Sequence, residues 1–218
     1  MKILLADDHA LFRDGLRYVL QQLAERVEIL EAPDFQVAMQ LASKHPELDM
    51  ALLDLHMPGS TGPKSVAYFH RRFPHIPVVV VSAEEDSVNI EKVMNSGATG
   101  FVCKSSSAQT MLNALKLVLA GGVYVPPEIL RHANSELMHD DKRNHQVANS
   151  HGLTPRQLEV LRHLCAGMSN KEIASTINLA EGTVKIHVAA ANQALNVNSR
   201  VEAVIVAEQL GLIGVTHG

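Results

Sequence analysis

Five side chains, each placed where a short apolar run ends, could together hold a metal ion and accept a phosphoryl group. They are Asp7, Asp8, Asp54, Ser82 and Lys104. Clustered carboxylates raise one another's pKa unless a cation joins them, and an oxygen-only ligand set suits Mg²⁺. Asp54 is the candidate nucleophile, because a carboxylate can form an acyl phosphate.

The remaining groups would stabilise the negative charge of the transferred phosphoryl group. We expect Mg²⁺ on Asp8, Asp54 and the main-chain carbonyl of His56, where it neutralises charge in the transition state. Lys104 supplies a compact positive charge to the phosphoryl oxygens, and Ser82 supplies a hydrogen-bond donor. A phosphoryl group adds a charge of roughly −1.5 to −2, which would draw Ser82 inward.

The first 120 or so residues contain the elements that must bring these positions together. Apolar runs alternate with segments of helical spacing, and runs such as Val78–Val81 are apolar on both faces, which is typical of central parallel strands. We therefore predict an α/β domain with a five-stranded, parallel, doubly wound sheet of the flavodoxin-like kind. Ligands bind at the carboxyl ends of such strands. The strands are expected at Lys2–Asp7, Glu28–Ala32, Met50–Leu55, Val78–Ser82 and Gly100–Lys104.

The C-terminal part is predicted to be all-α, with four helices. Three Ser/Thr-x-x-Glu/Gln capping boxes begin at Thr154, Ser169 and Ser199. The helices are expected near 154–166, 170–177, 181–195 and 199–210, and the middle two have the helix-turn-helix layout. We divide the chain into 1–122, a linker with a short helix (Glu128–Met138) at 123–150, and 151–218.

The third helix of this part is the predicted DNA-reading helix. Helical spacing turns Val184, Val188, Ala191 and Leu195 toward the core. Gly182 and the base-reading candidates on the other face turn outward, where an Ile can contact a thymine methyl and a Lys a guanine edge or phosphate. Lys171, near the start of the preceding helix, suits a phosphate contact. The predicted DNA-binding residues are Lys171, Thr183, Lys185, Ile186, Ala189, Asn192 and Gln193.

Residues 1–120 resemble a response-regulator receiver. The matching segments are Asp7-Asp8, Leu53–Gly59, Ser82-Ala83 and Gly97–Lys104. The resemblance implies that a sensor histidine kinase phosphorylates Asp54, that Asp7 and Asp8 help bind Mg²⁺, and that Ser82 and Phe101 are switch residues. Two departures are Ser105, where a cis proline often follows the lysine, and Phe101, which lacks the hydroxyl of many members.

Residues 153–213 resemble the LuxR-type domain of the NarL/FixJ subfamily. The matching segments are Leu153–Leu161, Ser169–Ala174, Glu181–Val188 and Ser199–Ala203. With the receiver, the resemblance covers about 85% of the chain and implies a transcription factor, not an enzyme, that binds promoter DNA as a homodimer, with RNA polymerase a further candidate partner. The implied dimer residues on the last helix are Val201, Val204, Ile205 and Glu208.

Charge and residue size in the DNA-reading helix predict DNA binding that is weaker, or more dependent on phosphorylation, than that of a basic homologue. Residues 151–218 contain five basic and five acidic residues, and the late stretch Ala189–Ala194 has neither a large apolar nor a basic residue. Each lost phosphate contact lowers the salt slope by about 0.9. A rival reading is therefore a signalling adaptor whose third helix binds protein. A Mg²⁺-dependent phosphatase fits poorly, because such enzymes use an Asp-x-Asp pattern that Asp7-Asp8-His9 does not match.

Composition and Cys usage favour a cytoplasmic protein that does not associate with a membrane. The uncharged stretches stay below the length of a membrane span, and the apolar run at Ile3–Leu5 is too short for a secretory core. Cys103 and Cys165 lie far apart, and we expect two reduced thiols. The recurring His132, His139, His145 and His151 are expected to be solvated rather than to bind a metal.

Overall fold

The N-terminal domain is built on a five-stranded parallel sheet. The computed structural model describes residues 1–83, 86–126, 151–197 and 199–212. The strand order is β2-β1-β3-β4-β5, as the alternation of strands and helices in the sequence predicts. Its strands are β1 (Lys2–Ala6), β2 (Glu28–Ala32), β3 (Met50–Leu53), β4 (Val78–Ser82) and β5 (Gly100–Cys103).

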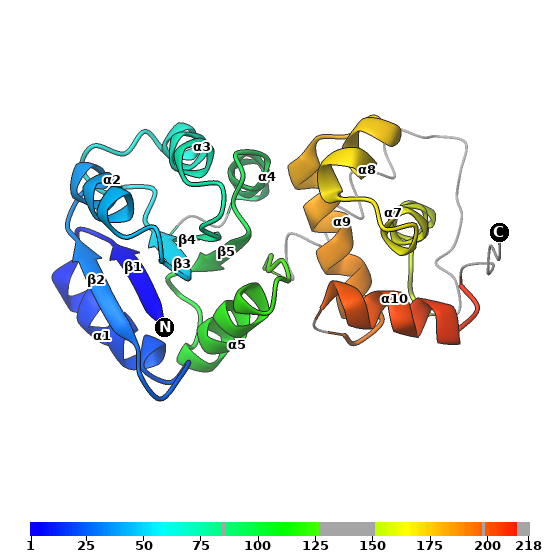
Figure 1. Cartoon of the computed structure of the whole chain (residues 1–218), viewed down its shortest axis with the longest axis horizontal. Helices are drawn as coiled ribbons and strands as arrows, with labels where there is room; N and C mark the ends of the chain where they lie inside the picture. Colours follow the sequence, from blue (N-terminus) through cyan, green and yellow to red (C-terminus); the bar gives the residue numbers. More distant parts are fainter. Residues whose placement is uncertain (84–85, 127–150, 198, 213–218) are drawn as a thin grey trace.

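Five helices cover the two faces of the sheet (Figure 1). They are α1 (Ala10–Leu20), α2 (Phe35–Lys44), α3 (Pro63–Arg72), α4 (Ser87–Asn95) and α5 (Ala108–Leu119). α1 and α5 pack on one face with side chains such as Ile3 and Val79, and α2, α3 and α4 pack on the other with side chains such as Leu4 and Val80. β3 and β4 are buried along their whole length, because helices lie on both sides of them.

Local signals in the sequence account for the ends of these helices. Asp34 and Asp86 are the N-caps of α2 and α4, where their carboxylates accept backbone N–H groups of Val37 and Val88. Gly97, just after α4, has a φ of 102°, a left-handed conformation that favours glycine. This turn returns the chain from α4 to β5.

The outer edge of β5 is covered by the segment that leaves the domain. Tyr124 forms a parallel bridge with Gly100, and the Phe101 N–H donates to the Tyr124 carbonyl at 3.0 Å. Val123 and Val125 on either side are buried. The sheet edge therefore has no open row of backbone groups at this point.

The C-terminal part is a separate bundle of four described helices. They are α7 (Pro155–Cys165), α8 (Asn170–Thr176), α9 (Glu181–Ala194) and α10 (Arg200–Gln209). Both partners of the capping boxes at Thr154 and Ser169 are in place, and the Ser199 hydroxyl accepts the Glu202 N–H. The core contains Val184, Val188 and Ala191, with Leu195 packed beside it, as helical spacing predicts.

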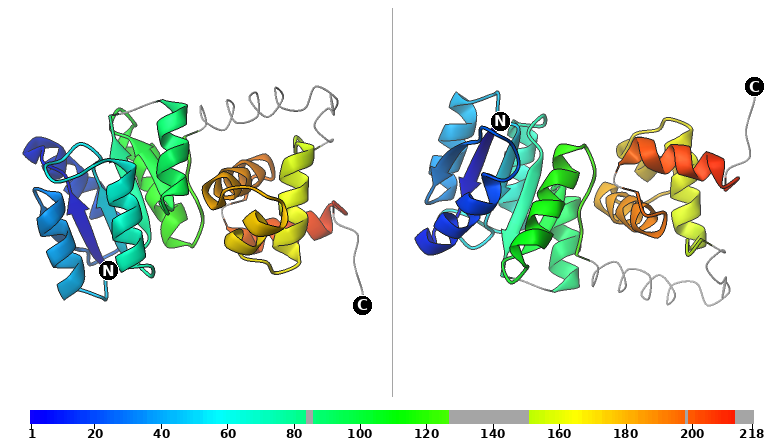
Figure 2. Two further views of the ribbon diagram at one scale, coloured as in Figure 1. Left: turned by 90° about the horizontal axis from the view of Figure 1, so that it is seen from above. Right: turned by 90° about the horizontal axis from the view of Figure 1, so that it is seen from below.

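The two domains lie side by side, with α9 against α4, in all views (Figures 1 and 2). The predicted short helix at 128–138 and the polar segment 139–150 fall outside the described residues. In the described part of the chain, no helix is long and apolar enough to cross a membrane.

Candidate functional site

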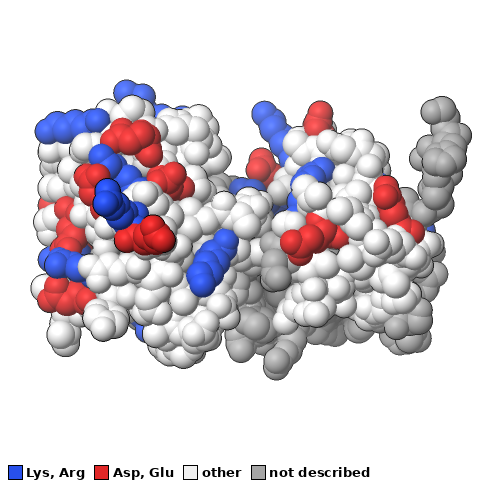
Figure 3. Space-filling model, turned by 60° about the horizontal axis from the view of Figure 1, so that its bottom comes forward, with Lys and Arg blue, Asp and Glu red and all other residues white. Residues whose placement is uncertain are grey.

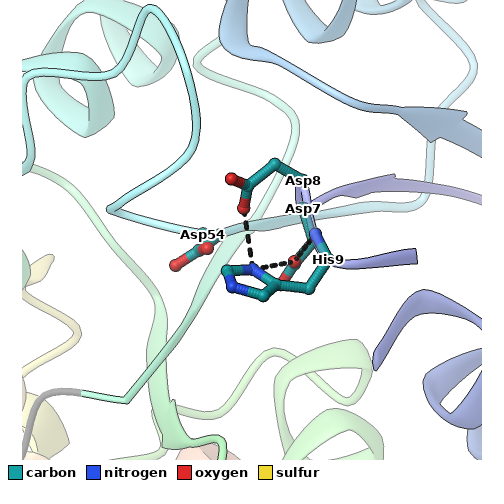
Figure 4. Close-up of side chains that lie close together, drawn as sticks. All are labelled: Asp7, Asp8, His9 and Asp54. Atoms are coloured by element: carbon teal, nitrogen blue, oxygen red, sulfur yellow. Dashed lines mark hydrogen bonds and ion pairs between the residues drawn. The ribbon is translucent and has the colours of Figure 1, made fainter. Parts of the chain in front are cut away.

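Three carboxylates meet at the carboxyl ends of β1 and β3 (Figure 4). Asp7 and Asp54 are almost fully buried, whereas Asp8 is exposed. One ligand atom from each of Asp7, Asp8, His9 and Asp54 lies within 4.8 Å of all the others. The parallel register of β1 with β3, which pairs Ala6 with Leu53, places these residues at one edge because each follows directly after its strand.

Lys104 joins two of these carboxylates from the end of β5. Its Nζ lies 2.9 Å from Asp54 Oδ2 and 2.7 Å from Asp7 Oδ2, although the second contact is an ion pair without hydrogen-bond alignment. Burial alone would lower the pKa of Lys104, but its contacts with Asp7 and Asp54 outweigh that effect and raise the pKa above the ordinary value of 10.5. The ammonium therefore stays charged and offsets the negative charge of both acids.

The donor set fits a hard divalent cation. Asp7, Asp8 and Asp54 present carboxylate oxygens within one cluster, and oxygen is the ligand type that such a cation prefers. The His56 N–H donates to Asp54 Oδ1 at 3.3 Å, so the backbone of His56 borders the same cluster. The acidic cluster itself is thus where the sequence predicts it.

Three neighbours of this cluster were not predicted from the sequence. The His9 imidazole Nδ1 lies 2.8 Å from Asp8 Oδ1, and the backbone N–H of His9 donates to Asp7 Oδ1 at 2.7 Å (Figure 4). The Arg13 guanidinium donates to the Asp7 carbonyl at 2.6 Å, and the Phe12 ring lies 4.9 Å from Lys104 Nζ. A helix directly after β1 could have suggested them, since residues in its first turn must lie near Asp7 and Asp8.

The two predicted switch positions are buried beside the cluster. Ser82 ends β4, the direct neighbour of β3, and Phe101 lies in β5 on the side covered by α3 and α4. The Lys104 N–H donates to the Ser82 carbonyl at 2.7 Å, so the lysine and the serine share one backbone hydrogen bond. The described residues contain no cis peptide bond, and the Lys104–Ser105 bond is therefore trans.

The predicted DNA-reading helix lies against the N-terminal domain. The Thr183 hydroxyl donates to Glu91 Oε1 of α4 at 3.0 Å, and Lys185 Nζ donates to the Ala98 carbonyl, in the turn between α4 and β5, at 3.3 Å. We call this packing of α9 on α4 and the Gly97–Ala98 turn the α4–α9 contact. Burial lowers the pKa of Lys185, although its neighbour Glu181 opposes this.

The α4–α9 contact also has an apolar part and a close steric fit. Ile186, Ala189 and Ala190 are buried in the same apolar cluster as Ile90, Val93 and Met94 of α4. Gly182 abuts the end of α4 so closely that a Cβ there would collide with the backbone of Asn95.

Where the sequence predicts an outward face, the structure therefore shows a covered one. Lys185, Ile186 and Ala189 turn toward the receiver and are buried, Asn192 is also buried, and Thr183 is half-buried. Lys171 and Gln193 remain exposed. The described residues on the face in Figure 3 mix both signs of charge, with no extended basic patch over the helical part.

The comparisons with known proteins match both domains. Residues 3–116 match the response regulator receiver domain, and residues 151–207 match the bacterial regulatory proteins of the luxR family. The chain is 40% identical over 206 residues to the glycerol metabolism activator of Pseudomonas putida, covering 94% of this chain and 93% of that protein. The chain belongs to the LuxR-type response regulators. This response regulator therefore functions in two-component control of transcription.

Two further similarities agree with this assignment. The response regulator is 30% identical over 204 residues to the nitrate/nitrite response regulator NarP of Escherichia coli, covering 94% of this chain and 93% of that one. A solved structure of RcsB from Salmonella typhimurium has the same fold, with a TM-score of 0.55 and 24% identity over 95% of this chain and 99% of that one.

The predicted dimer residues of the response regulator lie on α10, away from the α4–α9 contact. Val201 and Ile205 are among its exposed large apolar side chains, Glu208 is exposed, and Val204 is half-buried. His187 is buried in the helical domain. Cys103 and Cys165 are not joined by a disulfide bond.

Proposed function

We propose that a sensor histidine kinase phosphorylates Asp54 and that this phosphorylation frees α9 for promoter DNA. The observation that carries the proposal is that the receiver, which holds the buried acidic cluster, also covers α9. Four of the seven predicted DNA-binding residues are buried in this arrangement, and Thr183 is half-buried. The unphosphorylated chain therefore cannot present this face to a DNA groove until the α4–α9 contact opens.

The chemistry at Asp54 is a transfer between two side chains. An Asp54 carboxylate oxygen forms a bond to phosphorus while the bond from phosphorus to the kinase's imidazole nitrogen breaks, and the imidazole leaves with the electron pair. Asp7, Asp8, Asp54 and the His56 carbonyl would hold Mg²⁺, which neutralises charge on the transferred group. Lys104 already lies 2.9 Å from the Asp54 carboxylate and would bind a phosphoryl oxygen.

Shared hydrogen bonds would carry the signal from Asp54 to α9. Movement of Lys104 and Ser82 displaces the ends of β4 and β5, because the Lys104 N–H is bonded to the Ser82 carbonyl. α4 and the Gly97–Ala98 turn connect these two strands and contain the groups that bind Thr183 and Lys185. Moving this equilibrium from 1:99 to 99:1 takes about 5.5 kcal/mol, which several charge-assisted hydrogen bonds to a phosphoryl group can largely supply.

The proposal includes the partners and the domain division. The released chain would dimerise through Val201, Val204, Ile205 and Glu208 on α10, and contact with RNA polymerase would follow on the promoter. It would act as a regulator rather than an enzyme, in the cytoplasm, where promoter DNA is found. The receiver would span 1–122, the linker 123–150 and the DNA-binding domain 151–218.

Phosphorylation and DNA binding can be tested in one experiment. The chain is incubated with ³²P-labelled acetyl phosphate and Mg²⁺, and its binding is measured to a DNA duplex selected from a random pool by the beryllofluoride-treated protein. We expect labelling of the wild type, tighter DNA binding after labelling, and loss of both with Asp54→Asn or with EDTA. Asp49→Asn, an exposed acid outside the cluster, is the matched control. Labelling that persists in Asp54→Asn refutes the assigned site.

The same experiment separates a second function, a signalling adaptor whose α9 binds protein. The small residues at Ala189 and Ala190 already pack on a protein surface, which is the observation that favours it. If the labelled chain selects no DNA duplex from the pool although Asp54 is phosphorylated, the adaptor is the correct reading.

A further inference from the structure

The α4–α9 contact encloses an imidazole that none of the assigned functions uses. His70, in the last turn of α3, is half-buried, and its ring packs on Gly97 so closely that a Cβ on that glycine would overlap it. The carbonyl of the next residue in the same turn, Ala98, accepts a hydrogen bond from the Lys185 ammonium at 3.3 Å. His70 and Lys185 therefore both contact the same two-residue turn.

We propose that His70 and Lys185 form a proton-sensitive latch, which keeps the domains together while His70 is neutral and opens the α4–α9 contact when His70 binds a proton. This inference rests on the proposed function only for its effect on DNA binding. The opening itself is a property of the two domains.

The charges around His70 decide the direction of the effect. α9 contributes Lys185 and Glu181, whose side chains lie 3.5 Å apart. α4 contributes Glu91, which is hydrogen-bonded to Thr183. The Gly97–Ala98 turn contributes only backbone groups. On α3 itself, Arg71 and Arg72 are exposed. A proton on His70 thus places a second positive charge beside a buried ammonium.

The pKa of His70 has the matching direction. Burial of the ring, and to a smaller extent the charge of Lys185, lowers the pKa of His70 below the ordinary value of 6.5, although the charge of Glu181 opposes this. When the domains separate, α9 carries Lys185 away and the ring becomes solvated, so the pKa returns toward 6.5. The open state then binds more protons than the closed state, and by linkage the closed state loses its advantage as the pH falls below about 6.5.

The size of the effect follows from the difference between the two pKa values. For each unit by which the pKa of His70 is lower in the closed state than in the open state, protonation changes the ratio of open to closed molecules by up to about tenfold. At pH 8 His70 is neutral in both states, and the contact is at its most stable.

The test measures the His70 proton and the domain contact separately in the full-length chain. Imidazole ¹³C–¹H NMR follows His70 from pH 8 to 5.5, with its signal assigned from its absence in His70→Gln, and small-angle X-ray scattering follows domain separation. We expect a His70 pKa below 6.5 that rises in Lys185→Gln, and a chain that expands between pH 7.5 and 5.5. His70→Gln should abolish the expansion, and His75→Gln should retain it, since His75 is exposed and hydrogen-bonded to the Pro46 carbonyl.

Two results overturn the latch: a His70 pKa that does not change in Lys185→Gln, or the same pH-dependent expansion in His70→Gln. Circular dichroism at each pH is the control for whether the chain stays folded. DNA binding is measured last. If the chain opens at pH 6 in a His70-dependent manner but binds the selected duplex no better, the latch stands, and the proposed role of the α4–α9 contact in DNA binding fails.

Discussion

Replacing Gly182 with alanine should weaken the α4–α9 contact without weakening the fold of either domain. The added Cβ meets the backbone of Asn95 and Met94 rather than a flexible side chain, so α9 must shift away from α4. Overpacking of this kind costs about 1–3 kcal/mol. Within α9, alanine in place of glycine favours the helix by up to about 1 kcal/mol, and the isolated bundle should be at least as stable as before.

The cost translates directly into DNA binding by the unphosphorylated chain. A change of 1–3 kcal/mol alters the ratio of open to closed molecules roughly 5- to 150-fold, at 1.4 kcal/mol per tenfold change. The apparent affinity for DNA rises by the same factor until the open state predominates. Fluorescence anisotropy with the selected duplex measures this affinity, and small-angle scattering measures the separation of the domains.

Two further variants isolate the cause. Gly15→Ala on α1 makes the same chemical change in a helix where nothing lies within 4 Å of the new Cβ, and it should leave DNA binding unchanged. Glu91→Lys, on the receiver side, removes the acceptor of Thr183 and changes no residue of the helical domain, so it should reproduce the gain. If Gly182→Ala and Glu91→Lys both leave the domains closed and the affinity unaltered, the packing of α9 on α4 does not control access to DNA.

Three other perturbations follow from the described contacts. Lys104→Met removes the cation that contacts both the Asp7 and the Asp54 carboxylate, so without metal it should destabilise the receiver by on the order of 3 kcal/mol. In urea unfolding, Mg²⁺ should stabilise this variant more than it stabilises the wild type. An equal gain in both proteins would argue against a shared cation site. Burial, and to a smaller extent the charge of Arg156, lowers the pKa of His187 to about 4, although the charge of Glu159 opposes this. The neutral His187 therefore contributes its full share to the stability of the helical domain above pH 6.5, and that contribution is lost as the pH falls toward 4. The helical domain should be about 2 kcal/mol less stable at pH 5 than at pH 8, a difference that His187→Gln should reduce and that urea titrations at the two pH values measure. Operator binding should have a shallow salt dependence, because residues 151–218 carry five basic and five acidic side chains; a slope of log affinity against log salt steeper than about −6 would contradict it.

The sequence predicts the secondary structure and the acidic cluster well because both depend on local patterns and on topology. Val78–Ser82 forms a central strand as expected from its apolar faces, and Asp7, Asp54 and Lys104 meet because parallel strands end at a common edge. Helical spacing also separates the two faces of α9 correctly, with Val184 and Val188 in the bundle core.

The sequence patterns leave open whether the unphosphorylated receiver docks on the 181–195 helix or blocks dimerisation, so they do not decide that α9 is covered. Lys185 and Ile186 have the spacing of an outward face, and spacing within one helix does not show whether solvent, DNA or another domain meets that face. In the sequence, the small residues Ala189 and Ala190 indicate lost DNA contacts. In the structure these two residues and Gly182 allow α9 to approach α4 closely. A fit between two surfaces depends on contacts between residues far apart in the chain, which no local period reports.

The strip of chain at Val123–Val125 has a mechanical consequence, because it is fastened to the outer side of β5. Two copies could not pair their sheets edge to edge at β5 without first displacing this segment, and the segment therefore protects the receiver from aggregation through that edge. The strip also leads out of the receiver, and it is bonded to the strand that ends beside Lys104. A displacement of that strand would therefore also move Val123–Val125, close to the last described residue of the receiver.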